Sequence, residues 1–144
     1  MKRIIIPVLM VAVLASTGAV FAQQDAVKVV GHATTTPDTA TERELERIFL
    51  KKKTKWRTGQ TAEPVDQKST TVVRKLFTEE VLNKDLARVE SHWQAQVFSG
   101  KATPPETLAS DQEVIDFVRS TPGAVGYVSA NASTDGVKVI RIGE

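Results

Sequence analysis

The chain has 144 residues, with 19 Lys and Arg, 17 Asp and Glu, and no cysteine. Lys2 and Arg3 are the only charged residues among the first 22 positions, so the remainder carries 17 basic residues against 17 acidic ones. A general nucleic-acid-binding protein needs a surplus of positive charge to neutralise phosphates, so we exclude this class and expect no nucleic-acid partner. The lack of cysteine excludes a disulfide framework and thiolate metal sites.

The beginning of the chain has the organisation of a secretory signal peptide. The two basic residues precede an apolar run from Ile4 to Ala15, and Val20 and Ala22 occupy the −3 and −1 positions of a cleavage site. The run is shorter than the ~20 residues that a membrane-spanning helix needs, and no cysteine follows it for a lipid anchor. We therefore predict a signal peptide over residues 1–22 and a periplasmic domain over residues 23–144, without a membrane anchor after cleavage.

The next segment predicts a strand, a loop and a short helix. The β-branched run at 26–31 is typical of a strand, and the Thr-rich stretch at 32–40 is typical of a loop. Thr41 and Glu44 form a capping box that begins a helix. Apolar residues then recur on one helical face, namely Leu45, Ile48 and Phe49.

The segment 51–57, KKKTKWR, concentrates five basic residues around Trp56. One interpretation is a surface patch that binds a partner or an anion. The other is a solvated helix end and turn, in which Trp56 lies on the domain beside the lysine stems. Charge runs of this kind usually face the solvent, which favours the second interpretation.

The stretch 64–77, PVDQKSTTVVRKLF, predicts a strand, a polar turn and a helix that begins at Thr70. The free N–H groups and the dipole at a helix start favour a negatively charged ligand. Ser69, Thr70 and Thr71 add hydroxyl groups there, and Gln67 can both donate and accept hydrogen bonds. These residues predict either a binding site for a polar ligand or an N-cap formed by Ser69 or Thr70, with the other hydroxyls solvated.

The rest of the chain continues the alternation of helices and strands. The pattern predicts, in order, a helix over 86–97, a loop at 103–105, a helix capped by Ser110, a strand over 124–129 and a last strand over 137–142. The run 72–121 carries no strand signal, which indicates one crossover made of several helices. About four strands and four helices favour the α/β class, with helices covering a small sheet.

The sequence contains few residue patterns that are typical of enzyme active sites. His32 and His92 lie far apart in the sequence, without neighbouring residues at a metal-ligand spacing. No nucleophile elbow, Walker motif or dinucleotide-binding glycine pattern occurs, and Ser69 has no evident base to activate it. We therefore expect a binding protein and not an enzyme, with no catalytic residue, metal or cofactor.

Three stretches occur in an order and spacing that resemble one family: LERIFLKKKTKW, PVDQKSTTVVRKLFTEEVL and HWQAQVFSGKATPPETLASDQEVIDFVRSTPGAVGYV. Together they make residues 27–139 similar to the phosphate ABC-transporter substrate-binding proteins, above all to small exported members with little more than one lobe. The most specific pieces are Ile48-Phe49-Leu50 with Trp56 and Gly59, Trp93 with Phe98-Ser99-Gly100 and Pro104-Pro105, and the run from Pro122 to Tyr127.

This resemblance implies one lobe of a type II periplasmic binding-protein fold, with a small mixed sheet flanked by about four helices. In two-lobe members, an arginine shortly before Ser-Gly-Thr holds phosphate at the start of a helix. The corresponding stretch here is DQKSTT at 66–71, which lacks the arginine and the glycine. Arg74 would replace that arginine only if its side chain reaches back. The ligand-binding residues that the resemblance implies are Ser69 and Thr71, followed by Gln67 and Thr70.

Two hypotheses about function follow. The first is an exported solute-binding-like protein that binds phosphate or another small oxyanion weakly, without catalysis, and has an ABC permease or a periplasmic protein as its partner. The second is a degenerate lobe that serves as a periplasmic protein–protein interaction module through the basic segment 51–57.

Overall fold

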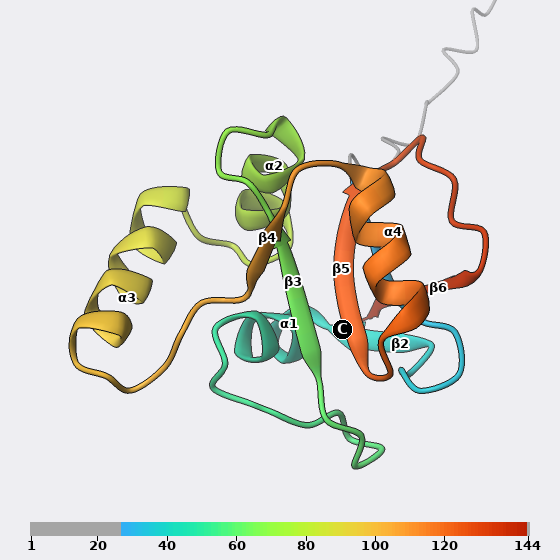
Figure 1. Ribbon diagram of the computed structural model, residues 1–144, viewed down its shortest axis with the longest axis horizontal. Helices are drawn as coiled ribbons and strands as arrows, with labels where there is room; N and C mark the ends of the chain where they lie inside the picture. The colour runs from blue at the N-terminus through green and yellow to red at the C-terminus, as the bar shows by residue number, and fades with distance from the viewer. Residues whose placement is uncertain (1–26, 144) are drawn as a thin grey trace, which may run out of the picture.

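The computed structural model describes residues 27–143 (Figure 1). The predicted signal peptide, residues 1–22, and its cleavage site lie outside the described residues and stay predictions. The elements are, in chain order, β1 (Val27–His32), β2 (Thr39–Thr41), α1 (Glu42–Phe49), β3 (Glu63–Gln67), α2 (Val72–Glu80), α3 (Leu86–Phe98), β4 (Glu106–Leu108), α4 (Asp111–Ser120), β5 (Ala124–Ser129), β6 (Val137–Val139) and β7 (Arg141–Gly143).

Five strands form one mixed sheet in the order β4-β3-β5-β1-β6. β1 runs antiparallel to its neighbours β5 and β6, whereas β3 runs parallel to β4 and β5. β2 and β7 form a separate parallel pair. The predicted α/β class, with a small mixed sheet flanked by four helices, is therefore confirmed.

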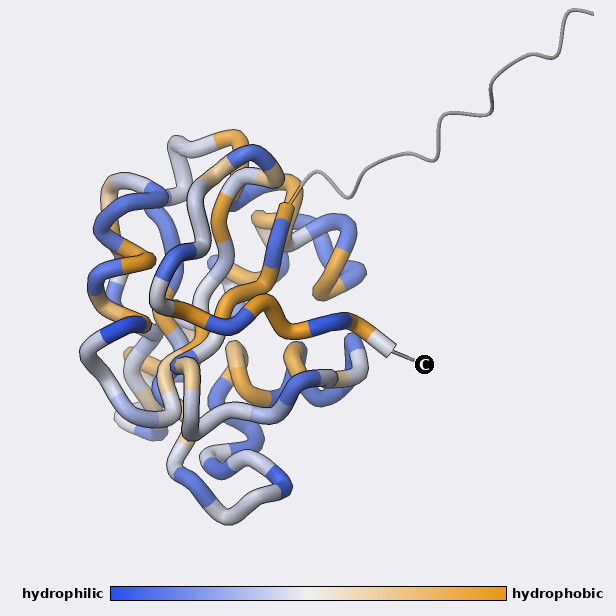
Figure 2. The backbone as a smooth tube through the Cα atoms, turned by 90° about the vertical axis from the view of Figure 1, so that its right-hand side faces the viewer, coloured by the Kyte–Doolittle hydropathy of each residue, from blue (hydrophilic) through white to orange (hydrophobic). Residues whose placement is uncertain are grey.

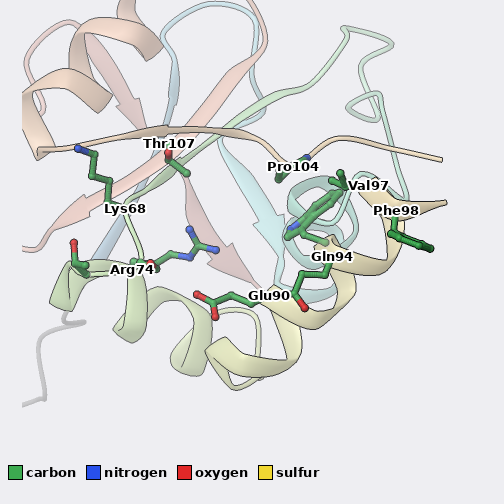
Figure 3. Close-up of a pocket in the computed structure, with 11 residues that line it drawn as sticks. Lys68, Arg74, Glu90, Gln94, Val97, Phe98, Pro104 and Thr107 are labelled. Carbon is green, nitrogen blue, oxygen red and sulfur yellow. The ribbon is translucent and has the colours of Figure 1, made fainter. Parts of the chain in front are cut away.

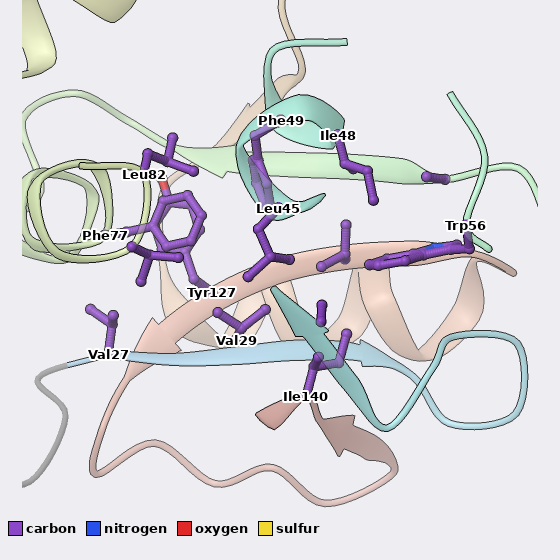
Figure 4. Close-up of a cluster of buried hydrophobic side chains, with 14 residues drawn as sticks. Val27, Val29, Leu45, Ile48, Phe49, Trp56, Phe77, Leu82, Tyr127 and Ile140 are labelled. Atoms are coloured by element: carbon purple, nitrogen blue, oxygen red, sulfur yellow. The ribbon is translucent and has the colours of Figure 1, made fainter. Parts of the chain in front are cut away.

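The central strands β1 and β5 separate two hydrophobic cores. Successive side chains of a strand point to opposite faces of a sheet. Val29 and Tyr127 accordingly join the core under α1 and α2, whereas Val30 and Val128 join the core under α4. Figure 4 shows the first core, in which the ring of Phe77 stacks on Tyr127 with 3.9 Å between centroids. Helices on both faces therefore leave the sheet in the middle layer.

Helix α3 lies to one side of this layered body (Figure 1). A small cluster of Leu50, Val89 and Trp93 holds it. Along the tube of Figure 2, hydrophilic and hydrophobic residues alternate in the helices, as expected for helices covered on one face. No helix within residues 27–143 has the length and apolar character needed to cross a bilayer.

Each of the four helices within residues 27–143 begins at a side-chain cap. In all four, the oxygen of the capping side chain accepts a hydrogen bond from an N–H group three residues further on, and the caps are Thr41, Thr71, Asp85 and Ser110. The predicted starts at Thr41 and Ser110 are confirmed. The predicted start at Thr70 is wrong, as is an N-cap at Ser69 or Thr70, because α2 begins at Val72 and Thr71 caps it.

Three predictions about strands are wrong. Residues 106–108 form β4, so the run 72–121 does contain a strand; these few residues gain their pairing from the neighbouring β3 and not from their own pattern. The predicted strand 137–142 is divided at Ile140 into β6 and β7, which join different sheets. Residues 39–41, predicted as loop, form β2 because β7 pairs with them.

We predict that Gly126→Ala destabilises the fold. A Cβ atom at this position in β5 would lie 2.6 Å from Cγ1 of Val114 and 2.9 Å from Cγ1 of Val65. Overpacking of a core usually costs about 1–3 kcal/mol. Urea unfolding of the variant measures this loss. Gly143→Ala serves as the control, because no heavy atom lies within 4 Å of a Cβ there. Equal stabilities of wild type and Gly126→Ala would contradict the prediction.

Candidate functional site

The turn between β3 and α2 is organised by Thr71. Its hydroxyl donates to the carbonyl oxygen of Lys68 at 2.9 Å and accepts from the N–H of Arg74 at 3.2 Å. These two bonds close the turn and cap the helix. The Thr71 side chain, predicted as ligand-binding, is therefore engaged in holding the turn.

Ser69 and Thr70 lie at the tip of this turn and are exposed. Among the described residues, their backbone N–H groups donate to no protein acceptor. Both residues line a cleft beside α2. They therefore offer hydroxyl groups and free N–H groups to a ligand next to the positive end of a helix.

Gln67, the fourth residue predicted to bind a ligand, is buried at the end of β3. Its side-chain Nε2 donates to Oδ1 of Asp111 at 2.8 Å and to the carbonyl oxygen of Tyr127 at 3.0 Å. Its backbone N–H donates to the Tyr127 hydroxyl at 3.0 Å. The Gln67 side chain thus connects β3, β5 and α4 within the protein.

Arg74 does reach back toward the end of β3. Its Nη1 donates to the carbonyl oxygen of Gln67 at 2.9 Å and lies 3.5 Å from Oδ1 of Asp66. The side chain is only 7% exposed, yet it lines the cleft together with Ser69 and Thr70. Among the described residues, Nε and Nη2 of Arg74 have no protein acceptor, so these donors remain available to a ligand.

The sequence signal for Arg74 is its position in the first turn of α2. Long side chains in a helix point back toward its N-terminus. An arginine three residues after the Thr71 cap is therefore placed to contact the strand that precedes the helix. Spacing alone does not show where a long side chain ends, so the sequence leaves this arrangement as a condition.

Asp66 lies beneath the site and is buried. The Tyr127 hydroxyl donates to its Oδ1 at 2.7 Å. Burial raises the pKa of Asp66 above its ordinary value, although the Arg74 guanidinium and the Tyr127 hydrogen bond both act in the opposite direction. Burial likewise raises the pKa of Tyr127, and the neighbouring Asp66 raises it further. Burial therefore shifts the titration of both acidic groups beside the Arg74 guanidinium to higher pH.

The cleft beside this network has a volume of about 790 Å³. It lies between α2, α3 and the segment that leads into β4. Its lining residues are Lys68, Ser69, Thr70, Arg74, Glu90, Trp93, Gln94, Val97, Phe98, Pro104 and Thr107. Figure 3 shows Lys68 and Arg74 toward one end, Val97 and Phe98 toward the other, and Glu90 between them. The cleft thus joins a cationic, hydroxyl-bearing end to an apolar end.

The basic segment 51–57 forms a turn in which Lys52, Lys55 and Arg57 are exposed. Lys53 contacts Glu44 at 2.9 Å, and Arg57 lies 3.6 Å from the same carboxylate. Trp56 is buried, and its Nε1 donates to the carbonyl oxygen of Gly123 at 3.0 Å. The interpretation of a helix end with Trp56 lying on the domain is therefore confirmed.

Within residues 27–143, no group of three or more histidine, aspartate or glutamate side chains is arranged to hold a metal ion. His32 hydrogen-bonds locally, with Nδ1 2.8 Å from the Thr35 hydroxyl. The chemistry of the cleft is consequently that of hydrogen-bond donors, one carboxylate and apolar side chains.

Comparisons with known proteins show which solved structures have a similar fold. No protein-family model matches the chain, and no curated protein matches it. Among solved structures it is similar to a candidate phosphate ABC transporter substrate-binding protein with bound phosphate from Clostridium perfringens, at 17% identity and a TM-score of 0.62 over 82% of this chain and 45% of that one.

Two further structures agree. An ABC-type phosphate transport receptor from Vibrio cholerae matches at 15% identity with a TM-score of 0.57, over 82% of this chain and 46% of that one. PstS from Borrelia burgdorferi matches at 16% identity with a TM-score of 0.63, over 83% and 48%. The chain spans about half the length of these proteins. At such identities the similarity establishes the fold alone: residues 27–143 adopt the fold of one lobe of a periplasmic binding protein.

Proposed function

We propose that this protein is an exported, periplasmic solute-binding lobe that binds phosphate or a similar small oxyanion without catalysing a reaction. The binding site is the turn before α2, where Arg74, Ser69 and Thr70 line one end of the cleft. The structural neighbours are described as phosphate transport proteins, which supports this class of ligand. An ABC permease or a periplasmic protein is the corresponding partner.

The observation that carries the proposal is the position of Arg74. A guanidinium presents its donors in a rigid fork that matches phosphate and carboxylate oxygens. Asp66 and the Gln67 carbonyl fix the Nη1 side of this fork, so Nε and Nη2 are held in place before a ligand arrives. The free N–H groups of Ser69 and Thr70 add donors from the helix start.

A single lobe binds such a ligand weakly. Three charge-assisted hydrogen bonds contribute roughly 5–9 kcal/mol at about 1.5–3 kcal/mol each. The loss of translational and rotational freedom on association costs about 4–15 kcal/mol. At the favourable ends of both ranges about 5 kcal/mol remains, which corresponds to a dissociation constant on the order of 0.1–1 mM at best. Tighter binding requires a second protein surface that encloses the anion.

Arg74→Lys tests the proposed site. Lysine keeps the positive charge beside Asp66 but loses the fork, so we expect phosphate and sulfate to bind about tenfold more weakly or worse, the value of one charge-assisted hydrogen bond. Isothermal titration at millimolar anion measures the loss, and thermal unfolding checks that the variant is folded. Arg88→Lys, on an exposed arginine of α3 outside the cleft, is the matched control.

The double variant Ser69→Ala/Thr70→Ala is a second test. Both residues are exposed, so we expect their truncation to leave the fold intact. We expect a several-fold loss of affinity, since the hydroxyls disappear while the backbone N–H groups remain. No heat with phosphate or sulfate in the wild-type protein would reject the proposed function.

The affinity for sulfate should depend on pH through Asp66. An ionised Asp66 compensates the charge of Arg74, whereas a protonated one leaves that charge to the ligand. Because burial raises the pKa of Asp66, the carboxyl loses its proton at a pH above the ordinary 3.8. Affinity should therefore fall as the pH rises through a midpoint above 3.8. Sulfate is the suitable probe, since its own charge is constant there.

Asp66→Asn is the control for this titration, because asparagine keeps an acceptor for the Tyr127 hydroxyl and carries no proton to lose. Its sulfate affinity should depend on pH less steeply than that of the wild type over the same interval. Parallel pH profiles of wild type and Asp66→Asn would show that Asp66 does not govern the site.

A further inference from the structure

The cleft is much larger than a tetrahedral inorganic anion. Its volume of about 790 Å³ lies within the range of about 300–1,000 Å³ that is usual for sites of larger organic ligands. At about 30 Å³ per molecule, it has room for on the order of 25 water molecules. An anion held by Arg74, Ser69 and Thr70 would therefore leave the opposite end of the cleft empty.

The opposite end is apolar and exposed. Phe98 is 96% exposed and Val97 is 53% exposed, both at the C-terminal end of α3. Trp93 and Pro104 line the cleft next to them. Adjacent large apolar side chains on a cleft wall mark a binding surface more often than scattered ones do. Trp93 packs with Val89 of the same helix and with Leu50, which follows α1, so this wall has a fixed base.

We propose that the cleft binds an organic oxyanion, in which a phosphoryl or carboxylate group is attached to an aromatic or aliphatic body. This inference rests on the proposed function. The anionic group contacts Arg74 and the turn at Ser69 and Thr70, and the body lies against Val97 and Phe98. The cationic end of the cleft matches the anionic group of such a ligand, and the apolar end matches its body (Figure 3).

Glu90 restricts the ligand further. Its carboxylate reaches from α3 toward Arg74 (Figure 3). A second negative charge on the ligand would meet this carboxylate, whereas a hydroxyl or ammonium group would find an acceptor. The cleft therefore favours a ligand with one anionic group at its end over a polyanion.

Phenyl phosphate and inorganic phosphate are the probes that test this inference, by isothermal titration of the purified protein. We expect phenyl phosphate to bind at least about tenfold more tightly, from the apolar surface that its ring buries. The variant Val97→Ser/Phe98→Ser should lose this difference while keeping the affinity for inorganic phosphate. Val72→Ser is the matched control, because Val72 is 71% exposed and lies outside the cleft.

The indole N–H signals of the two tryptophans provide an independent readout by NMR. Phenyl phosphate should shift the signal of Trp93, which lines the cleft, and leave that of the buried Trp56 in place. Assignment follows from Trp93→Phe, a substitution that retains an aromatic ring in the α3 cluster.

The possible failures differ in what they overturn. Equal affinities for both probes, or a ring effect that survives Val97→Ser/Phe98→Ser, would overturn the inference and leave the proposed function standing. If neither phenyl phosphate nor inorganic phosphate binds, the inference and the proposed function are both overturned. Self-association in analytical ultracentrifugation that is abolished by Val97→Ser/Phe98→Ser, and not by Val72→Ser, would assign the apolar wall to a second copy of the chain and overturn the inference.

Discussion

The buried ion pair between Asp66 and Arg74 determines the geometry of the candidate site. Both side chains are less than a tenth exposed, and Tyr127 and the Gln67 carbonyl provide their other hydrogen bonds. Removing one partner of such a pair typically costs about 3–5 kcal/mol, because the remaining charge stays buried. The pair therefore ties α2 to β3 and β5 and holds the guanidinium at the wall of the cleft. Arg74 thus stabilises the junction between β3 and α2 and also supplies the principal hydrogen-bond donor of the candidate site.

Local sequence patterns predicted most of the fold correctly. Thr41 and Ser110 carry capping information within one helical turn, and the apolar residues of α1 and α4 follow the helical period. The β-branched runs of β1 and β5 predicted the two central strands. The same local information led to the correct α/β class. What failed were the short strands β2, β4 and β7, whose existence depends on partners far away in the sequence.

The candidate site was predictable only as a region. The hydroxyl cluster and the helix start pointed to the turn at 68–71, but the side chains of Gln67 and Thr71 are occupied by Asp111, Tyr127 and Lys68. A residue type does not reveal which of its hydrogen bonds the protein itself already uses. The apolar end of the cleft was not predicted, because it depends on how the elements are placed in the fold. Phe98 occupies a helical position in the sequence, and its exposure follows from the placement of α3 beside the body of the domain.

The chain spans about half the length of these structural neighbours, and the proposed site draws its donors from Arg74 and from the turn at Ser69 and Thr70. The most direct test of that claim is a ¹H–¹⁵N NMR titration with sulfate that follows the Arg74 Nε–H signal and the backbone signals of Ser69 and Thr70. We predict saturable shifts of all three signals with a single dissociation constant. Saturation confined to other residues, with the Arg74 signal unchanged, would contradict the account.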